Sequence, residues 1–326
     1  MIRIGIAVVV FWLTACAPVS VPLGAAVTEP EFTDDAFTAS DGTRLPARAW
    51  KPETDPPKAV ILALHGFNDY SYFFDDPGDF LRARGVASFA YDQRGFGTAP
   101  NPGSWAGVAA YARDAADAVR ALKRRFPGTP IFLQGTSMGG AVAMVAAGGG
   151  VLPKVDGVIL AAPAVWGRAT MPWYQRWALW LGAHSVPWMS VTGQGLGILP
   201  SDNIEMLVAL GQDPLVIKET RIGTLYGLVN LMDAGLASAS GLTTPALILY
   251  GERDQVIPKL PTRRMLVNVP SAARVALYEG GYHMLLRDLP AMTVWKDIAA
   301  WIDDRAAPLP SGADKRDVAR LLGEDD

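Results

Sequence analysis

The chain alternates between two kinds of hydrophobic pattern. Short, continuous apolar runs are typical of strands that are covered on both faces of a sheet, and they occur at residues 59–64, 86–91, 131–133, 158–162, 246–250 and 274–278. Between them, apolar residues recur at helical spacing, in segments 73–84, 105–125, 139–147 and 292–302. A hairpin is expected over 37–50, around Ser-Asp-Gly at 40–42. The alternation predicts parallel β-α-β units, and therefore a doubly wound α/β sheet.

One interval breaks this alternation. Residues 165–241 contain no strand-like run, and they hold Trp166, Trp173, Trp177, Trp180 and Trp188. An interval of this length is too long for a plain loop. It predicts a helical cap inserted after the sixth strand, if the hairpin contributes the first two. The core is then expected to span 34–164 and 242–305, followed by a C-terminal tail over 306–326.

The N-terminal residues have the pattern of an export signal. Arg3 precedes an apolar run over 4–13, which is too short to span a bilayer as a helix. The following Leu-Thr-Ala-Cys at 13–16 resembles the bacterial lipobox, in which the cysteine carries the lipid. We therefore expect a lipoprotein signal peptide over 1–15, lipidation of Cys16 and a tether over 16–33. The predicted product is an exported lipoprotein of the cell envelope, held in the outer membrane if the cell is Gram-negative; the alternative is an ordinary cleaved signal.

Composition excludes several classes of protein. The 326 residues include 29 Lys and Arg against 32 Asp and Glu, so the charge offers no basic footprint for nucleic acid. A single cysteine excludes an intramolecular disulfide framework and a cysteine-rich zinc site. Only three histidines are present, which leaves few candidates for any imidazole chemistry. We expect no metal, no nucleic-acid partner and no obligate protein partner.

A Gly-x-Ser-x-Gly motif follows the apolar run 131–133 and precedes the small-residue segment 139–147. A serine on a tight strand-to-helix turn needs small neighbours, and its hydroxyl is then exposed above the sheet. The motif, G-T-S-M-G at 135–139, resembles the nucleophile elbow of the α/β-hydrolase fold. This resemblance implies that Ser137 is a nucleophile; the alternative is a tight turn without chemistry.

The resemblance also orders the partners of Ser137, because in this fold an acid and then a histidine follow the serine. That order selects His283, which follows the last predicted strand, as the base. Asp254 follows the strand at 246–250, and the family spacing G-x-x-D favours it as the acid over the nearby Glu252. The alternatives are a structural loop histidine and an aspartate that only forms a turn.

Further motifs narrow the resemblance: L-H-G-F at 64–67, D-Q-R-G-F-G at 92–97, G-E-R-D at 251–254 and G-Y-H-M at 281–284. Together with the cap, they resemble the monoacylglycerol lipase and lysophospholipase group, also called the serine aminopeptidase S33-like hydrolases. The resemblance implies an oxyanion hole formed by the backbone N–H groups of Phe67 and Met138. The chain departs from the group in its lipobox and in the tryptophan density of its cap.

Trp173 and Trp177, with Trp180, lie on one face of a predicted helix. Such a stripe is commonly buried core. The alternative is a substrate-binding role, either as the wall of an acyl-chain channel or as a lid that faces the membrane, because indole rings favour the interface between hydrocarbon and water.

The leading hypothesis is a lipid-anchored serine hydrolase that cleaves the acyl ester of a monoacylglycerol or a lysophospholipid and needs no cofactor. The same three residues would also serve a proline iminopeptidase-like aminopeptidase, which should offer an acidic group for the substrate amine. A third hypothesis is a non-catalytic envelope lipoprotein that uses the fold for binding.

Overall fold

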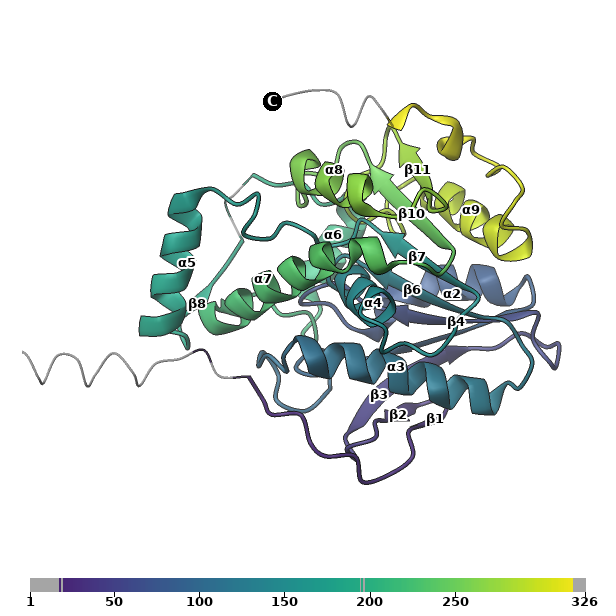
Figure 1. Cartoon of the computed structure of the whole chain (residues 1–326), viewed down its shortest axis with the longest axis horizontal. Coiled ribbons are helices and arrows are strands. Elements are labelled where there is room, and N and C mark those ends of the chain that lie inside the picture. The colour runs from purple at the N-terminus through teal and green to yellow at the C-terminus, as the bar shows by residue number, and fades with distance from the viewer. Residues whose placement is uncertain (1–17, 19, 194, 196, 319–326) are drawn as a thin grey trace, which may run out of the picture.

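A computed structural model describes residues 18, 20–193, 195 and 197–318. Within these residues, the main sheet has the strand order β1-β2-β3-β5-β4-β6-β7-β10-β11 (Figure 1). Its strands are β1 (Glu31–Phe32), β2 (Ala36–Thr38), β3 (Arg44–Trp50), β4 (Ala59–Leu64), β5 (Val86–Tyr91), β6 (Ile131–Thr136), β7 (Gly157–Ala161), β10 (Ala246–Gly251) and β11 (Arg274–Tyr278). Strands β5, β4, β6, β7, β10 and β11 are parallel to one another. β3 pairs with β5 in the antiparallel direction.

Helices cover both faces of the sheet, as the apolar runs predicted. The side chains of β4 alternate between two cores: Leu62 packs with α3 (Val108–Arg125) and α4 (Met138–Gly148). Ile61, one residue earlier, packs on the other face with α2 (Asp75–Arg82) and α9 (Ala291–Asp303). Every residue of β4 is buried. The predicted doubly wound α/β fold is therefore confirmed.

Among the described residues, three α-helices lie between β7 and β10, where the sequence predicts the cap. They are α5 (Trp173–Ser185), α6 (Ile204–Gln212) and α7 (Ile222–Ala237), and a small ribbon joins β8 (Ser190–Val191) to β9 (Thr220–Arg221). α7 packs closely on α4, since a Cβ on Gly235 would lie 3.3 Å from that of Ala141. α5 packs against α7 at the outer edge of the molecule (Figure 1). The strand before the cap is β7 rather than the sixth strand, because β1 precedes the predicted hairpin.

The N-terminal segment differs from the predicted tether. Residues 31–32 form β1, and the N–H of Val27 donates to the carbonyl oxygen of Ser40 at 2.8 Å. The tether expected over 16–33 therefore extends too far, because its last residues belong to the sheet. The predicted signal peptide over 1–15 and Cys16 lie outside the described residues. Within the part of the chain that the structure describes, no helix has the length and apolar composition needed to cross a bilayer.

One helix and the packing of the C-terminal tail were not predicted. α8 (Lys259–Asn268) follows β10 and buries Met265 in the core on the α4 side of the sheet. Part of the tail expected over 306–326 packs on the domain, because Leu309 is buried and the hydroxyl of Ser311 donates to Asp297 at 2.5 Å.

Candidate active site

The turn between β6 and α4 presents Ser137 at the carboxyl edge of the sheet. β6 ends at Thr136 and α4 begins at Met138, so Ser137 makes the turn alone, with φ +51° and ψ −114°. This conformation is strained for a residue with a side chain. The crowding of the turn explains the motif's second glycine, because a Cβ on Gly139 would lie 2.2 Å from the carbonyl oxygen of Leu64. The strand–turn–helix context expected for the motif is present.

His283 lies in the loop after β11 and is paired with a buried carboxylate. Its Nδ1 lies 2.8 Å from Oδ2 of Asp254. The other oxygen of Asp254 accepts hydrogen bonds from the N–H groups of Val256 and Ile257, at 2.8 and 2.9 Å. Three contacts therefore orient the carboxylate, whose side chain is fully buried. Of the two acidic candidates, Asp254 and not Glu252 is the partner of His283.

The remaining histidines have other environments. His65 is fully buried; its Nε2 accepts a hydrogen bond from the N–H of Gln93 at 2.9 Å, and its Nδ1 faces a backbone carbonyl 2.7 Å away. Burial lowers the pKa of His65, which favours a neutral ring. His184 lies on α5, where its Nδ1 faces a carbonyl of its own helix. His283 is the histidine that lines a cavity together with Ser137.

The predicted oxyanion donors lie on both sides of Ser137. Residues 65–70, here called the oxyanion loop, follow β4 and contain Phe67. A Cβ on Gly66 would lie 3.5 Å from the Cβ of Ser137, so this loop passes directly beside the serine. Met138 is the first residue of α4, where the N–H groups have no acceptor within the helix and the helix dipole is positive. The arrangement is suited to holding an oxyanion.

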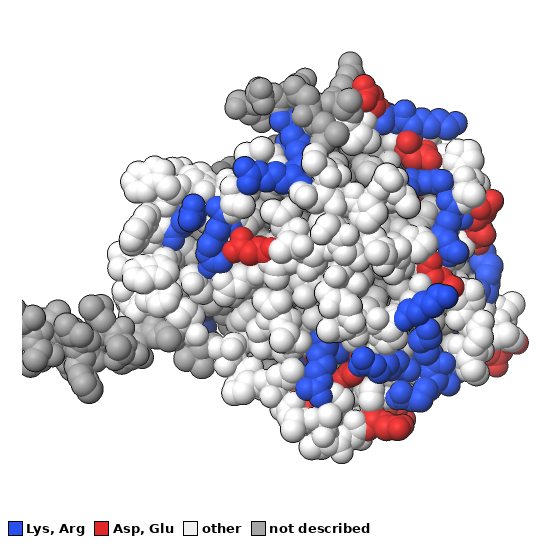
Figure 2. All heavy atoms as spheres, in the orientation of Figure 1, with Lys and Arg blue, Asp and Glu red and all other residues white. Residues whose placement is uncertain are grey.

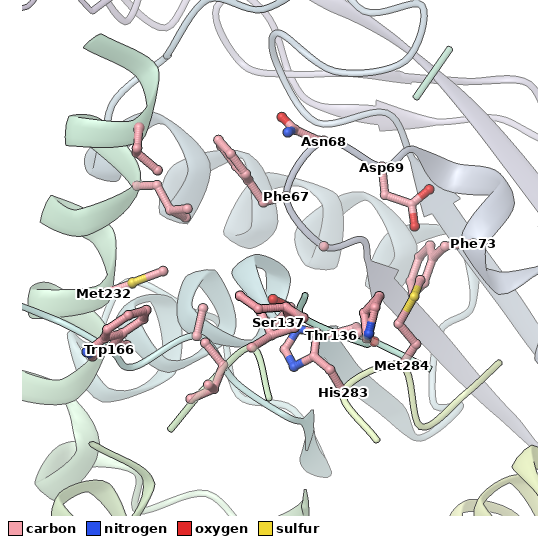
Figure 3. Close-up of a pocket in the computed structure, with 18 of the residues that line it drawn as sticks. Phe67, Asn68, Asp69, Phe73, Thr136, Ser137, Trp166, Met232, His283 and Met284 are labelled. Carbon is pink, nitrogen blue, oxygen red and sulfur yellow. The ribbon is translucent and has the colours of Figure 1, made fainter. Parts of the chain in front are cut away.

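Ser137 and His283 open into a cavity of about 640 Å³ beneath the cap. Figure 3 shows the ring of His283 beside Ser137, with Trp166 and Met232 farther along the same cavity. Most of the lining is apolar and comes from the cap, the oxyanion loop and the loop after β11, including Phe67, Trp166, Leu179, Leu228, Met232 and Met284. Among residues 20–193 and 197–318, no cluster of three or more His, Cys, Asp or Glu could hold a metal ion.

The structure overturns two of the three interpretations of Trp173 and Trp177, the buried core and the wall of an acyl-chain channel. Their side chains are 72% and 63% exposed, and neither lines the cavity. α5 instead turns Gln175 and Leu179 toward the cavity. The tryptophans share one face of the helix, as the spacing predicted, but α5 packs against α7 with that face outward. Both the buried-core interpretation and the channel interpretation of this stripe are therefore wrong.

The residues that support the loops of Phe67 and His283 were not predicted from the sequence. The carboxylate of Asp69 in the oxyanion loop is paired with Arg287 at 3.0 Å. Asp288 is buried, and its carboxylate accepts a hydrogen bond from the N–H of Tyr282, the residue before His283, at 2.8 Å. Burial raises the pKa of Asp288. Acidic residues close to the oxyanion and histidine motifs were the available signal, but Arg287, the partner of Asp69, lies 218 positions away in sequence.

Comparison with known proteins places this fold and site in a class. A family model described as serine aminopeptidase, S33, matches residues 55–290. The chain is an α/β-hydrolase. It belongs to the serine aminopeptidase S33 family, which confirms the family resemblance predicted from its motifs.

Individual relatives agree with this assignment. The chain is 28% identical over 278 residues to the human monoglyceride lipase. The match covers 82% of this chain and 89% of that protein. It is 26% identical over 282 residues to the monoacylglycerol lipase of Mycolicibacterium smegmatis, covering 83% and 96%. Among solved structures, a soluble variant of the Saccharomyces cerevisiae monoglyceride lipase superposes with a TM-score of 0.68 at 23% identity, over 89% of this chain and 100% of that one.

Proposed function

We propose that this carboxylic-ester hydrolase cleaves the acyl ester of a monoacylglycerol or a lysophospholipid, with Ser137 as nucleophile, His283 as base and Asp254 as the acid that orients it. The observation that carries the proposal is the buried Asp254–His283 pair, which meets the serine of a strained turn in one apolar cavity. A carboxylate on Nδ1 leaves Nε2 free to act on the serine hydroxyl.

The reaction then proceeds in two balanced steps. The Oγ of Ser137 attacks the ester carbonyl while Nε2 of His283 takes the hydroxyl proton, and the N–H groups of Phe67 and Met138 stabilise the oxyanion. Collapse of this intermediate breaks the bond to the alcohol, which leaves with the proton from His283. Water then attacks the acyl-enzyme by the same route, which releases the fatty acid and restores Ser137.

The lining of the cavity favours a lipid ester over an aminoacyl substrate. An aminopeptidase needs a carboxylate that can pair with the substrate ammonium group. Asp69 lines the cavity, but its carboxylate is already paired with Arg287 at 3.0 Å. The predominantly apolar remainder is instead suited to an acyl chain, whose burial is favourable in proportion to its area.

Labelling with a fluorophosphonate probe tests the enzyme against the non-catalytic alternative. We expect labelling of the wild-type protein and none of Ser137→Ala; absence of Ser137-dependent labelling would favour a binding or scaffold role. Hydrolysis of monoacylglycerols, lysophospholipids and aminoacyl amides by the wild-type protein, without the probe, then decides the substrate. Faster turnover of the amides would favour the proline iminopeptidase-like alternative.

We further propose that Cys16 carries the lipid anchor and that the outer face of α5 meets the bilayer. Pro18, two residues after the cysteine, lines a surface pocket together with Tyr226 of α7. The ring of Tyr226 contacts the ring of His184. Trp180 stacks on His184, with 4.7 Å between the two ring centroids. The start of the described chain therefore lies at the same end of the molecule as the exposed tryptophans.

The surface at this end fits a lipid interface. Figure 2 shows the α5 end largely in white, whereas most charged side chains gather toward the opposite end. Exposed indole rings favour the boundary between headgroups and acyl chains. Cell fractionation tests the anchor: we expect the wild-type protein in the envelope membrane fraction and Cys16→Ser in the soluble fraction. Retention of Cys16→Ser in the membrane to the same extent as wild type would contradict lipidation at this residue.

A further inference from the structure

One segment of the cap contacts both loops that supply the proposed catalytic groups. Residues 200–220, here called the α6 strap, comprise α6 and its two flanks. The first flank is hydrogen-bonded to residues 282–289, here called the histidine loop, and the second is hydrogen-bonded to the oxyanion loop. The strap is thus the part of the cap that spans the distance between His283 and Phe67.

The first flank holds the backbone on both sides of His283. The N–H of Met284 donates to the carbonyl oxygen of Pro200 at 3.0 Å. The buried hydroxyl of Ser201 donates to Asp288 at 2.7 Å, and the second oxygen of Asp288 accepts the N–H of Tyr282. The residues before and after His283 are therefore fixed through the cap.

The second flank holds the oxyanion loop at the residue next to Phe67. The side-chain N–H of Asn68 donates to Oγ1 of Thr220 at 2.7 Å, and its backbone carbonyl accepts the N–H of Ile217 at 3.0 Å. Two residues further on, the hydroxyl of Tyr70 donates to Asp213 at 2.8 Å. The loop therefore has three hydrogen bonds to the strap within three residues.

The conformation of Asn68 explains why these contacts matter. Asn68 has φ +65°, a left-handed conformation that costs energy for a residue with a side chain, although asparagine tolerates it better than most. The side-chain oxygen of Asn68 is buried and has no partner among the described residues, so its orientation depends on the bond to Thr220. Loss of that bond would let Asn68 leave its left-handed conformation, which would shift the adjacent Phe67 together with its N–H group.

We propose that Asn68 is a positioning residue, and that the α6 strap, through Thr220 and Asn68, holds the N–H of Phe67 in the geometry that binds the oxyanion. The proposal rests on the proposed function, because it assigns a support to that oxyanion hole. It makes the cap a support for the oxyanion hole as well as a cover over the substrate. A contact of this kind acts on the transition state more than on substrate binding.

The test compares Thr220→Val, which keeps the size of the side chain and removes the acceptor, with Thr220→Ser, which keeps the hydroxyl. With a soluble butyrate ester, we expect Thr220→Val to lower kcat about tenfold with KM nearly unchanged, since loss of an oxyanion donor itself costs about 100-fold or more. The affinity for a trifluoromethyl ketone analogue should fall by the same factor, because the analogue's oxyanion uses the same donors. Thr220→Ser should restore both values.

A matched control is Val208→Ala, which alters an exposed residue of α6 that does not line the cavity. It should leave kcat and the analogue affinity unchanged. Tyr70→Phe removes a second hydrogen bond between the oxyanion loop and the strap. If Thr220→Val does not fold, the kcat of Tyr70→Phe tests the proposal in its place. A wild-type kcat in folded Thr220→Val and Tyr70→Phe, or a rise in KM alone, would overturn the proposal. Absence of Ser137-dependent turnover in the wild-type protein would instead overturn the proposed function.

Discussion

Asp254 is bound to His283 by one carboxylate oxygen while its other oxygen accepts two backbone N–H groups. The two backbone donors fix the direction in which the oxygen that contacts His283 points. Asp254 therefore presents an acceptor, and only an acceptor, to Nδ1 of His283. This relationship selects the imidazole tautomer that carries its proton on Nδ1 and keeps Nε2 available as a base.

Replacement of this acceptor should separate its chemical role from its structural one. Asp254→Asn keeps the shape of the side chain but can present an N–H to His283, which favours the wrong tautomer. We expect kcat for a soluble ester to fall roughly 10³- to 10⁴-fold, with a much smaller change in thermal stability. Glu252→Gln is the matched control and should stay near wild-type activity. Equal losses in the two variants would contradict the assignment of Asp254.

The sequence predicted the parts of this site that depend on local pattern. β4 reads as a continuous apolar run, and every one of its residues is buried. The turn at Ser137 is encoded by adjacent glycines whose absent side chains are required by the crowding around it. The choice of Asp254 over Glu252 followed from the family resemblance, whose spacing G-x-x-D lies within one short loop. Each of these features is set by a few neighbouring residues, so no knowledge of distant contacts was needed.

Features that depend on distant packing were not predictable in the same way. The spacing of Trp173 and Trp177 placed them on one face of α5, but the packing of α5 against α7 decides that this face points outward. β1 is two residues long and exists because Phe32 packs with Phe37. The bond between Asn68 and Thr220 joins residues 152 positions apart. No local pattern contains these relationships.

The depth of the cavity should control the acyl-chain length that the enzyme accepts. Leu179 lines the cavity from α5, so Leu179→Trp would fill space that a long chain needs. We expect kcat/KM for long-chain monoacylglycerols to fall about tenfold or more relative to short-chain esters, because overfilling a packed site costs about 1–3 kcal/mol. Leu181→Trp, on the exposed side of the same helix, should change neither value. Parallel losses on all chain lengths in Leu179→Trp would argue against this site for the acyl chain.

The exposed tryptophans should matter for membrane binding and not for the chemical step. In a Cys16→Ser background, which removes the proposed lipid anchor, the double substitution Trp173→Ser and Trp177→Ser should reduce binding to phosphatidylcholine vesicles roughly tenfold or more. Hydrolysis of a soluble butyrate ester should be unchanged, because neither residue lines the cavity. Val267→Ser, an equally exposed apolar position on α8, is the control for vesicle binding. Unchanged sedimentation of the tryptophan variant with vesicles would exclude this face as the lipid contact.

Removal of the buried cation Arg94 should destabilise the fold to an extent that depends on pH. Arg94 forms two hydrogen bonds to Asp114, at 2.6 and 2.8 Å, and pairs with Asp41 at 2.9 Å. Burial raises the pKa of Asp114 to about 6 even beside this cation. Burial also opposes ionisation of Asp41, but the hydrogen bond from Arg94 holds the pKa of Asp41 well below its usual value.

Arg94→Met would leave two buried carboxylates without their cation, which should lower the free energy of unfolding at pH 7 by about 3–5 kcal/mol. Both carboxylates would then have a higher pKa in the folded than in the unfolded protein, so the folded variant binds more protons. Its unfolding free energy should therefore rise relative to wild type as the pH falls from 7 toward 5. Urea unfolding at several pH values measures the gap in unfolding free energy between wild type and Arg94→Met. Arg82→Met, which breaks a half-exposed pair with Asp79, should cost less than about 1 kcal/mol without this trend. A gap for Arg94→Met that is constant with pH would mean that the arginine supports the fold by packing alone.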